Sequence, residues 1–205
     1  PVYTEEFPVF CRQVESQSLE VEINGTWQRY PCSLFSSVPG TAGQTLEADL
    51  VFFSGPADYQ RSDLSFLRGK AVVHLGAHIE SRESYTRLME AEPAFILFVD
   101  IRYPGTVPLA DGMFPAYTKD LGAKPSLNVA FQDAWNWSYN KASRARICID
   151  GGMEKSVSHN IIIEFPGTDK DAGWIYAGAH HDTQADTVGA DDDGSGCTVI
   201  SEMAA

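Results

Sequence analysis

The sequence predicts an α/β fold in two parts, a strand-rich first part and the opening strands and helix of an α/β sheet. The first part contains a strand–helix–strand unit, with apolar strands at residues 71–75 and 95–99 and a helix at 81–91 between them. The second part contains an almost wholly apolar strand at residues 174–179, followed by a loop and a helix. Such continuous apolar character is typical of a strand buried on both faces, as at the centre of an α/β sheet.

The first part begins with a hairpin at residues 19–30. Apolar and acidic side chains alternate along it up to Asn24-Gly25, a pair that favours a tight two-residue turn. The rest of this part is expected as a strand at 50–53, a Pro- and Gly-rich loop at 103–125, a strand at 126–131 and a helix at 134–141.

The texture of the sequence changes after residue 141. Two strands, 144–150 and 156–165, are expected on either side of Gly151-Gly152. A final helix, which Ser195 can cap, reaches the last residue without a stop signal, so we expect the chain to be a fragment of a longer protein. The sequence therefore predicts two domains, residues 1–141 and a truncated domain of residues 142–205.

The composition excludes some classes of partner. The net charge is −13 and the pI is near 4.6. An acidic surface repels phosphate backbones and anionic lipid, so nucleic acid is not an expected partner. No run of about eighteen apolar residues is present, so no membrane span is expected. The oligomeric state is left open.

The four cysteines have no zinc-finger spacing. Cys11 and Cys32 lie in what the sequence predicts to be an irregular N-terminal region, where a disulfide and buried free thiols are both open; free thiols are favoured. The cysteines do not fix the compartment, and a secreted or cell-envelope location is the favoured one.

Chemistry concentrates at the end of the chain. His180 and Asp182 stand at the carboxyl end of the predicted apolar strand, at positions i and i+2, which point to the same face. Open α/β sheets bind ligands at that edge. A Gly-rich loop with three aspartates, residues 189–196, then precedes the helix. Taken singly, a histidine at a strand end is usually structural, and aspartates before a helix usually cap it. The order of strand, histidine, aspartate, acidic loop and helix is more restrictive, and it is the context that a metal site would need.

The segments 158–167, 178–182 and 189–196 together resemble the di-zinc aminopeptidases, the family of bacterial leucyl aminopeptidases that is related to glutamate carboxypeptidase. The resemblance implies that His180 is a zinc ligand, that Asp182 orients His180, and that Asp192 bridges two zinc ions. His181 occupies a position that is usually aromatic or apolar, and its side chain is expected to face the other way. The family also uses a Glu-Glu pair, whose first member is the general base, and further Asp and His ligands, all of which would lie beyond Ala205.

Residues 45–131 are similar to a protease-associated domain, which this family often has before its catalytic part. The similarity lies in the pattern of apolar and polar residues at 48–53 and 67–73 and in the helix and strand that follow. It implies a protease-associated-like domain with an N-terminal hairpin at 1–141, followed by the first part of a three-layer α/β zinc exopeptidase domain at 142–205.

The resemblance implies a zinc-dependent exopeptidase that removes N-terminal residues from peptide substrates, and that is inactive as this segment alone. Two alternatives stay open. One is a non-catalytic receptor or interaction protein on the same scaffold, and the other is a glutaminyl cyclase, an acyltransferase that holds a single zinc. Retention of both His180 and Asp192 argues against the receptor, and the acidic loop favours the peptidase over the cyclase. The preferred substrate side chain is left open.

Overall fold

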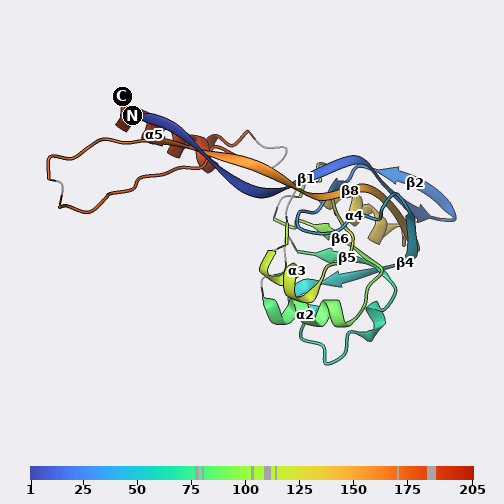
Figure 1. Cartoon of the computed structure of the whole chain (residues 1–205). Coiled ribbons are helices and arrows are strands. Elements are labelled where there is room, and N and C mark those ends of the chain that lie inside the picture. The colour runs from blue at the N-terminus through green and yellow to red at the C-terminus, as the bar shows by residue number, and fades with distance from the viewer. Residues whose placement is uncertain are drawn as a thin grey trace. The chain divides into compact units, whose positions relative to one another are not determined.

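The computed structural model of the chain describes residues 1–76, 79, 81–102, 104–108, 112–113, 115–169, 171–183 and 188–205 (Figure 1). The strands are β1 (Val2–Ile23), β2 (Thr26–Tyr30), β3 (Ser33–Leu34), β4 (Thr45–Ser54), β5 (Ala71–Leu75), β6 (Phe95–Val99), β7 (Ser126–Val129) and β8 (Arg144–Ile163). The helices are α1 (Gly55–Asp58), α2 (Arg82–Glu90), α3 (Pro115–Leu121), α4 (Phe131–Tyr139) and α5 (Ser195–Ala204), with short helical turns η1 (Ser65–Leu67) and η2 (Ala190–Gly194).

The chain forms two compact units. One unit contains residues 12–154, and the other combines residues 1–11 with residues 155–205. This division differs from the predicted boundary after residue 141. The reason is that the first part of β8 pairs with β4 and buries Ala145, Ile147 and Ile149 in the core of the larger unit. The assignment of residues 142–205 to a separate catalytic domain stays a prediction.

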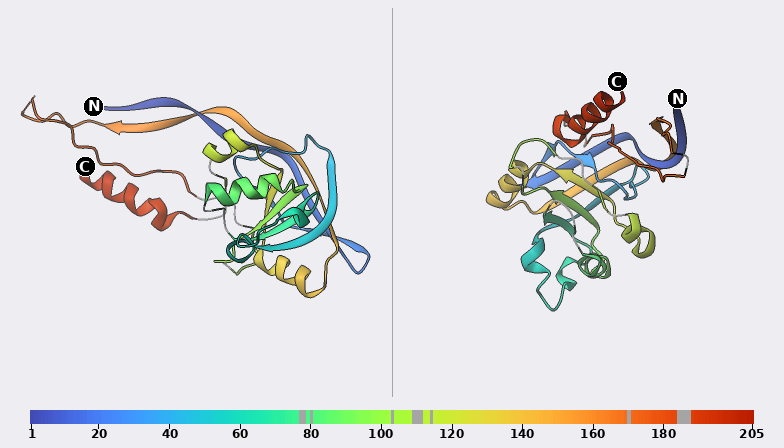
Figure 2. Two further views of the ribbon diagram at one scale, coloured as in Figure 1. Left: turned by 90° about the horizontal axis from the view of Figure 1, so that it is seen from below. Right: turned by 90° about the vertical axis from the view of Figure 1, so that its left-hand side faces the viewer.

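The sheet of the larger unit confirms the expected α/β character. The strands run in the order β2-β1-β8-β4-β5-β6-β7-β3, and β4, β5, β6 and β7 are parallel to one another. Every residue of β6 and β7 is buried, as the apolar run in β6 predicts. Helices α2 and α3 lie on one face of these strands and α4 on the other (Figures 1 and 2). Layered burial of this kind holds the central strands out of water.

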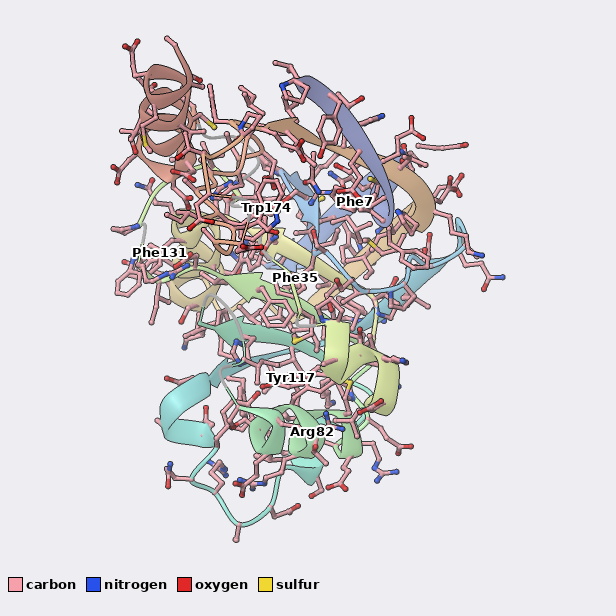
Figure 3. The ribbon with its side chains drawn as sticks, turned by 60° about the vertical axis from the view of Figure 1, so that its left-hand side comes forward. Phe7, Phe35, Arg82, Tyr117, Phe131 and Trp174 are labelled. Atoms are coloured by element: carbon pink, nitrogen blue, oxygen red, sulfur yellow. The ribbon has the colours of Figure 1, made fainter. Side chains whose placement is uncertain are left out.

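The core of the larger unit is rich in aromatic side chains. Trp137 of α4 is fully buried, and its ring meets that of Tyr30 edge-on at 5.1 Å. Phe35 stacks on Phe98 of β6 at 4.1 Å between ring centroids (Figure 3). On the other face, the guanidinium of Arg82 in α2 lies over the ring of Tyr117 in α3, labelled in the same figure. Aromatic pairs contribute roughly 0.5–1.5 kcal/mol each beyond the area that they bury.

Local sequence signals predict several elements well. The hairpin is confirmed, with Leu19 opposite Tyr30 and positive φ angles at Asn24 and Gly25, as a two-residue turn requires. Strands β5 and β6 have the predicted bounds. Helix α2 begins after Ser81, whose hydroxyl accepts a hydrogen bond from the Ser84 amide at 3.1 Å.

Several predictions about the elements are wrong. Helix α3 lies inside the segment predicted as a loop, because it buries no residue and so shows no apolar period. The N-terminal region is not irregular, since β1 starts at Val2. Residues 174–179 are not a strand, and Trp174, Ile175 and Tyr176 are exposed (Trp174 is labelled in Figure 3). An extended segment becomes a strand only beside a partner, and no strand pairs with these residues within the described part of the chain.

Strand β8 runs through Gly151-Gly152, where the sequence predicts a break. Gly151 has φ +139°, which L side chains rarely adopt. A Cβ on Gly151 would lie 2.2 Å from the carbonyl oxygen of Gln13 in β1, and a Cβ on Gly40 would lie 2.1 Å from the carbonyl oxygen of Gly151. The glycines therefore allow three backbone segments of the larger unit to approach closely.

The smaller unit contains the first residues of β1, the last residues of β8 and the C-terminal segment. The Tyr3 hydroxyl donates to Glu164 Oε1 at 2.7 Å, and the Glu164 amide donates to the Pro1 carbonyl at 3.0 Å. The two ends of the chain thus contribute to one unit, which the sequence did not predict. None of the helices in the described ranges combines the length and apolar character needed to cross a membrane.

Candidate metal centre

The site lies in the smaller unit, where residues 178–183 have no regular secondary structure and η2 precedes α5. His180 and Asp192 meet there, with 2.8 Å between Nε2 and Asp192 Oδ1. The other ring nitrogen, Nδ1, lies 3.0 Å from the backbone carbonyl oxygen of Asp182 and 3.3 Å from its Oδ1. The structure therefore brings together the three residues that the sequence singled out. Their roles as ligands and as an orienting group stay predictions.

The loop that presents Asp192 depends on its glycines. Gly189 has φ +61°, and a Cβ there would lie 2.1 Å from the Thr183 side chain. The Gly194 amide donates to the Gly189 carbonyl at 2.9 Å, which closes the loop. Asp192 and Asp193 have non-helical backbone angles inside η2, and the peptide bond between them is cis. From this non-helical part of η2, the Asp192 carboxylate faces His180 Nε2.

Asp193 is the residue that sequence reasoning missed. Its Oδ2 accepts a hydrogen bond from the His180 amide at 3.1 Å, and its Oδ1 accepts one from the Gly196 amide at 3.1 Å. The signal that could have found it is its place just before a helix, where an aspartate often caps.

The centre is open to solvent. The His180 side chain is 53% exposed, Asp192 is 76% exposed and Asp182 is 85% exposed. The described ranges contain no cluster of three or more His, Cys, Asp or Glu side chains suited to hold a metal ion. His180 with Asp192 is thus a partial donor set.

Both ring nitrogens of His180 face oxygen acceptors. Nδ1 faces the carbonyl oxygen of Asp182, and Nε2 faces the carboxylate of Asp192. Such surroundings favour the doubly protonated ring over the neutral one. This arrangement raises the pKa of His180, first through the bond to the Asp182 backbone and then through Asp192 and the charge of Asp193.

We expect the pKa of His180 to lie above the ordinary value for histidine when the ring is observed by NMR during a pH titration of the metal-free chain. The Asp192→Asn variant should move that pKa back down, because it removes a negative acceptor. Since the folded-state pKa is raised, any stability that His180 contributes is present at low pH and is lost as the pH rises through that pKa. An unchanged pKa in Asp192→Asn would contradict the contact at Nε2. Asp191→Asn removes the same charge one residue away and is the matched control.

The other histidines that the structure describes contact groups outside the centre. His181 Nε2 lies 3.3 Å from the His159 carbonyl oxygen, so its ring points to a different neighbour from that of His180. His159 Nε2 lies 3.2 Å from Glu6 Oε1. His74 is 1% exposed in the larger unit, next to the Tyr59 hydroxyl. His78 lies outside the described residues.

The four cysteines are free thiols, so the Cys11–Cys32 disulfide is not formed, and all four are only partly buried. Burial raises the pKa of the Cys32 thiol to about 11. Cys197 is the thiol nearest to the chemistry, and its Sγ donates to the His180 carbonyl at 3.2 Å.

Comparison with known proteins points to one family. Residues 160–205 match the model of Peptidase family M28, whereas no curated protein matches the chain by sequence. A zinc aminopeptidase from Bacillus subtilis (BSAP) has a similar solved structure, with TM-score 0.76 and 21% identity over 100% of this chain and 46% of that chain. An aminopeptidase from Aneurinibacillus sp. strain AM-1 has TM-score 0.63 and 20% identity over 100% of this chain and 48% of its own.

A Peptidase M28 precursor from Shewanella amazonensis SB2B has TM-score 0.62 and 16% identity, covering 78% of this chain and 40% of its own. The chain thus spans less than half the length of the solved structures that it matches. These comparisons confirm the predicted resemblance in two respects: residues 160–205 match Peptidase family M28, and the chain shares the fold of a solved zinc aminopeptidase and of a second solved aminopeptidase.

Proposed function

We propose that this chain contributes to a zinc-dependent aminopeptidase that hydrolyses N-terminal residues from peptides. The observation that supports this most is the meeting of His180 Nε2 and Asp192 Oδ1 at 2.8 Å within the segment that matches Peptidase family M28. The activity is proposed for the whole protein to which residues 1–205 belong, because the chain spans less than half of the solved aminopeptidases.

The donor atoms fit zinc. Imidazole nitrogen and carboxylate oxygen are both ordinary zinc ligands. His180 would bind through Nε2 when that nitrogen carries no proton. Asp192 would bind through the carboxylate that now faces Nε2. Bound zinc would supply Lewis-acid chemistry, which is what hydrolysis of a peptide bond at neutral pH needs.

The proposal includes two ions with Asp192 shared between them. Only Oδ1 of Asp192 faces His180, and a carboxylate has a second oxygen to offer to another cation. The remaining ligands and the general base would come from sequence outside residues 1–205, because the described residues gather no third donor at His180.

Asp182 would hold His180 ready for the metal. Its carbonyl and carboxylate oxygens both lie within 3.3 Å of Nδ1, so they keep the proton on that nitrogen and leave Nε2 as the ligand atom. A carboxylate partner also makes the imidazole a better ligand. Replacing such a partner lowers metal affinity or activity by about 10- to 100-fold in other metal sites.

Two observations favour the peptidase over the alternatives. One solved neighbour is named as a zinc aminopeptidase and another as an aminopeptidase. The chain also keeps both predicted ligands in contact. A protease-associated role for the larger unit stays part of this proposal.

The test is an assay of the longest protein encoded with this chain, against a panel of aminoacyl-p-nitroanilides and an N-terminal Gln peptide. We expect turnover of the p-nitroanilides that a chelator removes and zinc restores. His180→Ala should lower the turnover by at least about 100-fold, because even the loss of a group that only contacts a metal ligand lowers activity by up to about 100-fold.

His181→Ala is the matched control, since its ring contacts the His159 carbonyl instead, and it should keep most of the activity. Cyclisation of the Gln peptide without p-nitroanilide turnover would assign the cyclase. Absence of both activities in a folded, zinc-loaded protein would favour the receptor.

A further inference from the structure

The backbone of His180 is held on both sides by the start of α5. Its amide donates to Asp193 Oδ2 at 3.1 Å, and its carbonyl accepts from Cys197 Sγ at 3.2 Å. These contacts involve no atom of the imidazole ring. They fix where the Cα–Cβ bond of His180 starts, whereas Asp182 and Asp192 act on the ring itself.

Asp193 joins this backbone to the helix. Its second oxygen, Oδ1, accepts from the Gly196 amide at 3.1 Å, so one carboxylate bridges the His180 segment and the first turn of α5. The side chain is 26% exposed, against 76% for Asp192. Both oxygens are therefore engaged as acceptors, and the group is the most shielded carboxylate at the centre.

Gly196 gives Asp193 its room. A Cβ at position 196 would lie 2.1 Å from Asp193 Oδ1 and 2.7 Å from its Cγ. Any larger residue at this position would push the carboxylate away from the helix. The Gly-Ser-Gly stretch after the aspartates is thus explained by the bridge as well as by the turn.

We propose that Asp193 is a positioning residue that sets the backbone of His180 and so places its imidazole opposite Asp192. This inference rests on the proposed function, because a positioned imidazole matters only where it binds metal. Asp193 is not a ligand here: its Oδ2 lies 4.0 Å from Nε2 and its oxygens are committed to the two amides. It acts through His180.

Asp193→Asn tests the hydrogen bonds specifically, because Asn has the same shape as Asp but replaces one acceptor oxygen by an NH₂ group. In Asp193→Asn, one of the two backbone amides would face an NH₂ group, so the bridge would be lost at one end. Asp191→Asn is the matched control. It removes the same charge two residues earlier, at a residue whose backbone carbonyl accepts a hydrogen bond from the Ser195 hydroxyl at 2.8 Å.

The first measurement uses the metal-free 205-residue chain and follows amide hydrogen exchange by NMR. The amide that faces the new NH₂ group, that of His180 or that of Gly196, should exchange about tenfold faster in Asp193→Asn than in the unaltered chain, as a lost local hydrogen bond predicts. In Asp191→Asn the exchange rate should stay within about twofold. Unchanged rates at both the His180 and the Gly196 amide in a folded Asp193→Asn chain overturn the proposal.

The second measurement is competition for Zn²⁺ between the chain and a chromophoric chelator. Asp193→Asn should weaken zinc binding by about tenfold, which is within the range known for groups that contact a metal ligand but not the metal. In a His180→Ala background the same substitution should have no further effect, because Asp193 acts through His180. An equal loss in both backgrounds, or no loss in either, overturns the positioning role.

The two proposals fail in different ways. If the unaltered chain and the longer protein bind no zinc that depends on His180, the proposed function fails, and the exchange rate alone then decides whether Asp193 holds the backbone. If zinc binding depends on His180 but not on Asp193, the proposed function stands and this inference fails.

Discussion

No turnover of aminoacyl-p-nitroanilides is expected from the 205-residue chain, with or without added zinc. Hydrolytic zinc sites use about three protein ligands for each ion and a base that activates the nucleophile. Within the described residues, only His180 and Asp192 are placed together as metal donors. Asp182 contacts Nδ1 of the ring, and the Asp193 carboxylate accepts hydrogen bonds from two backbone amides. We therefore expect a rate indistinguishable from the buffer, at least about 1,000-fold below that of the longer protein.

The assay should compare the chain with the longer protein at equal zinc and equal concentration. Circular dichroism of the chain shows whether it is folded, so that inactivity cannot be blamed on an unfolded sample. Zinc-dependent turnover by the chain, lost in His180→Ala, would contradict the expectation. It would mean that a residue within these 205 supplies the base.

The sequence predicts best what is decided locally. The Asn24-Gly25 turn sets the hairpin through its own φ angles, and β5 and β6 follow from apolar runs of the right length. Strands β1 and β8 could not be delimited in this way. Their length and pairing depend on residues more than a hundred positions apart, as in the bond from Tyr3 to Glu164.

In the candidate site too, the sequence predicts the residue types but not the backbone contacts. His180, Asp182 and Asp192 were identified because residue type and order are visible in the sequence. The bridge made by Asp193 joins two backbone amides, and backbone contacts leave no mark on residue type except at Gly196. The predicted strand at 174–179 failed because apolar character shows what a segment can pack against, not whether a partner strand is present.

Gly151→Ala should destabilise the larger unit by about 3 kcal/mol. A residue with a Cβ is strained at φ +139°, at a cost of roughly 1–3 kcal/mol. The new Cβ would also lie 2.2 Å from the Gln13 carbonyl oxygen and 2.7 Å from Val14 Cα. These are backbone atoms of a paired strand, so they cannot turn aside as a flexible side chain would, and overpacking adds roughly 1–3 kcal/mol.

Urea denaturation followed by circular dichroism measures the effect, and Gly152→Ala is the matched control. A Cβ at position 152 would have its nearest neighbour at 3.8 Å, the Gly40 amide nitrogen, which is an ordinary contact. We expect its free energy of unfolding to stay within about 1 kcal/mol of the unaltered chain, since the added side chain also restricts the unfolded state. If Gly151-Gly152 were a simple turn between two separate strands, no such difference between the two substitutions would be expected. Equal midpoints would therefore contradict a continuous β8, and a lower midpoint for Gly151→Ala alone would place the close crossing at Gly151.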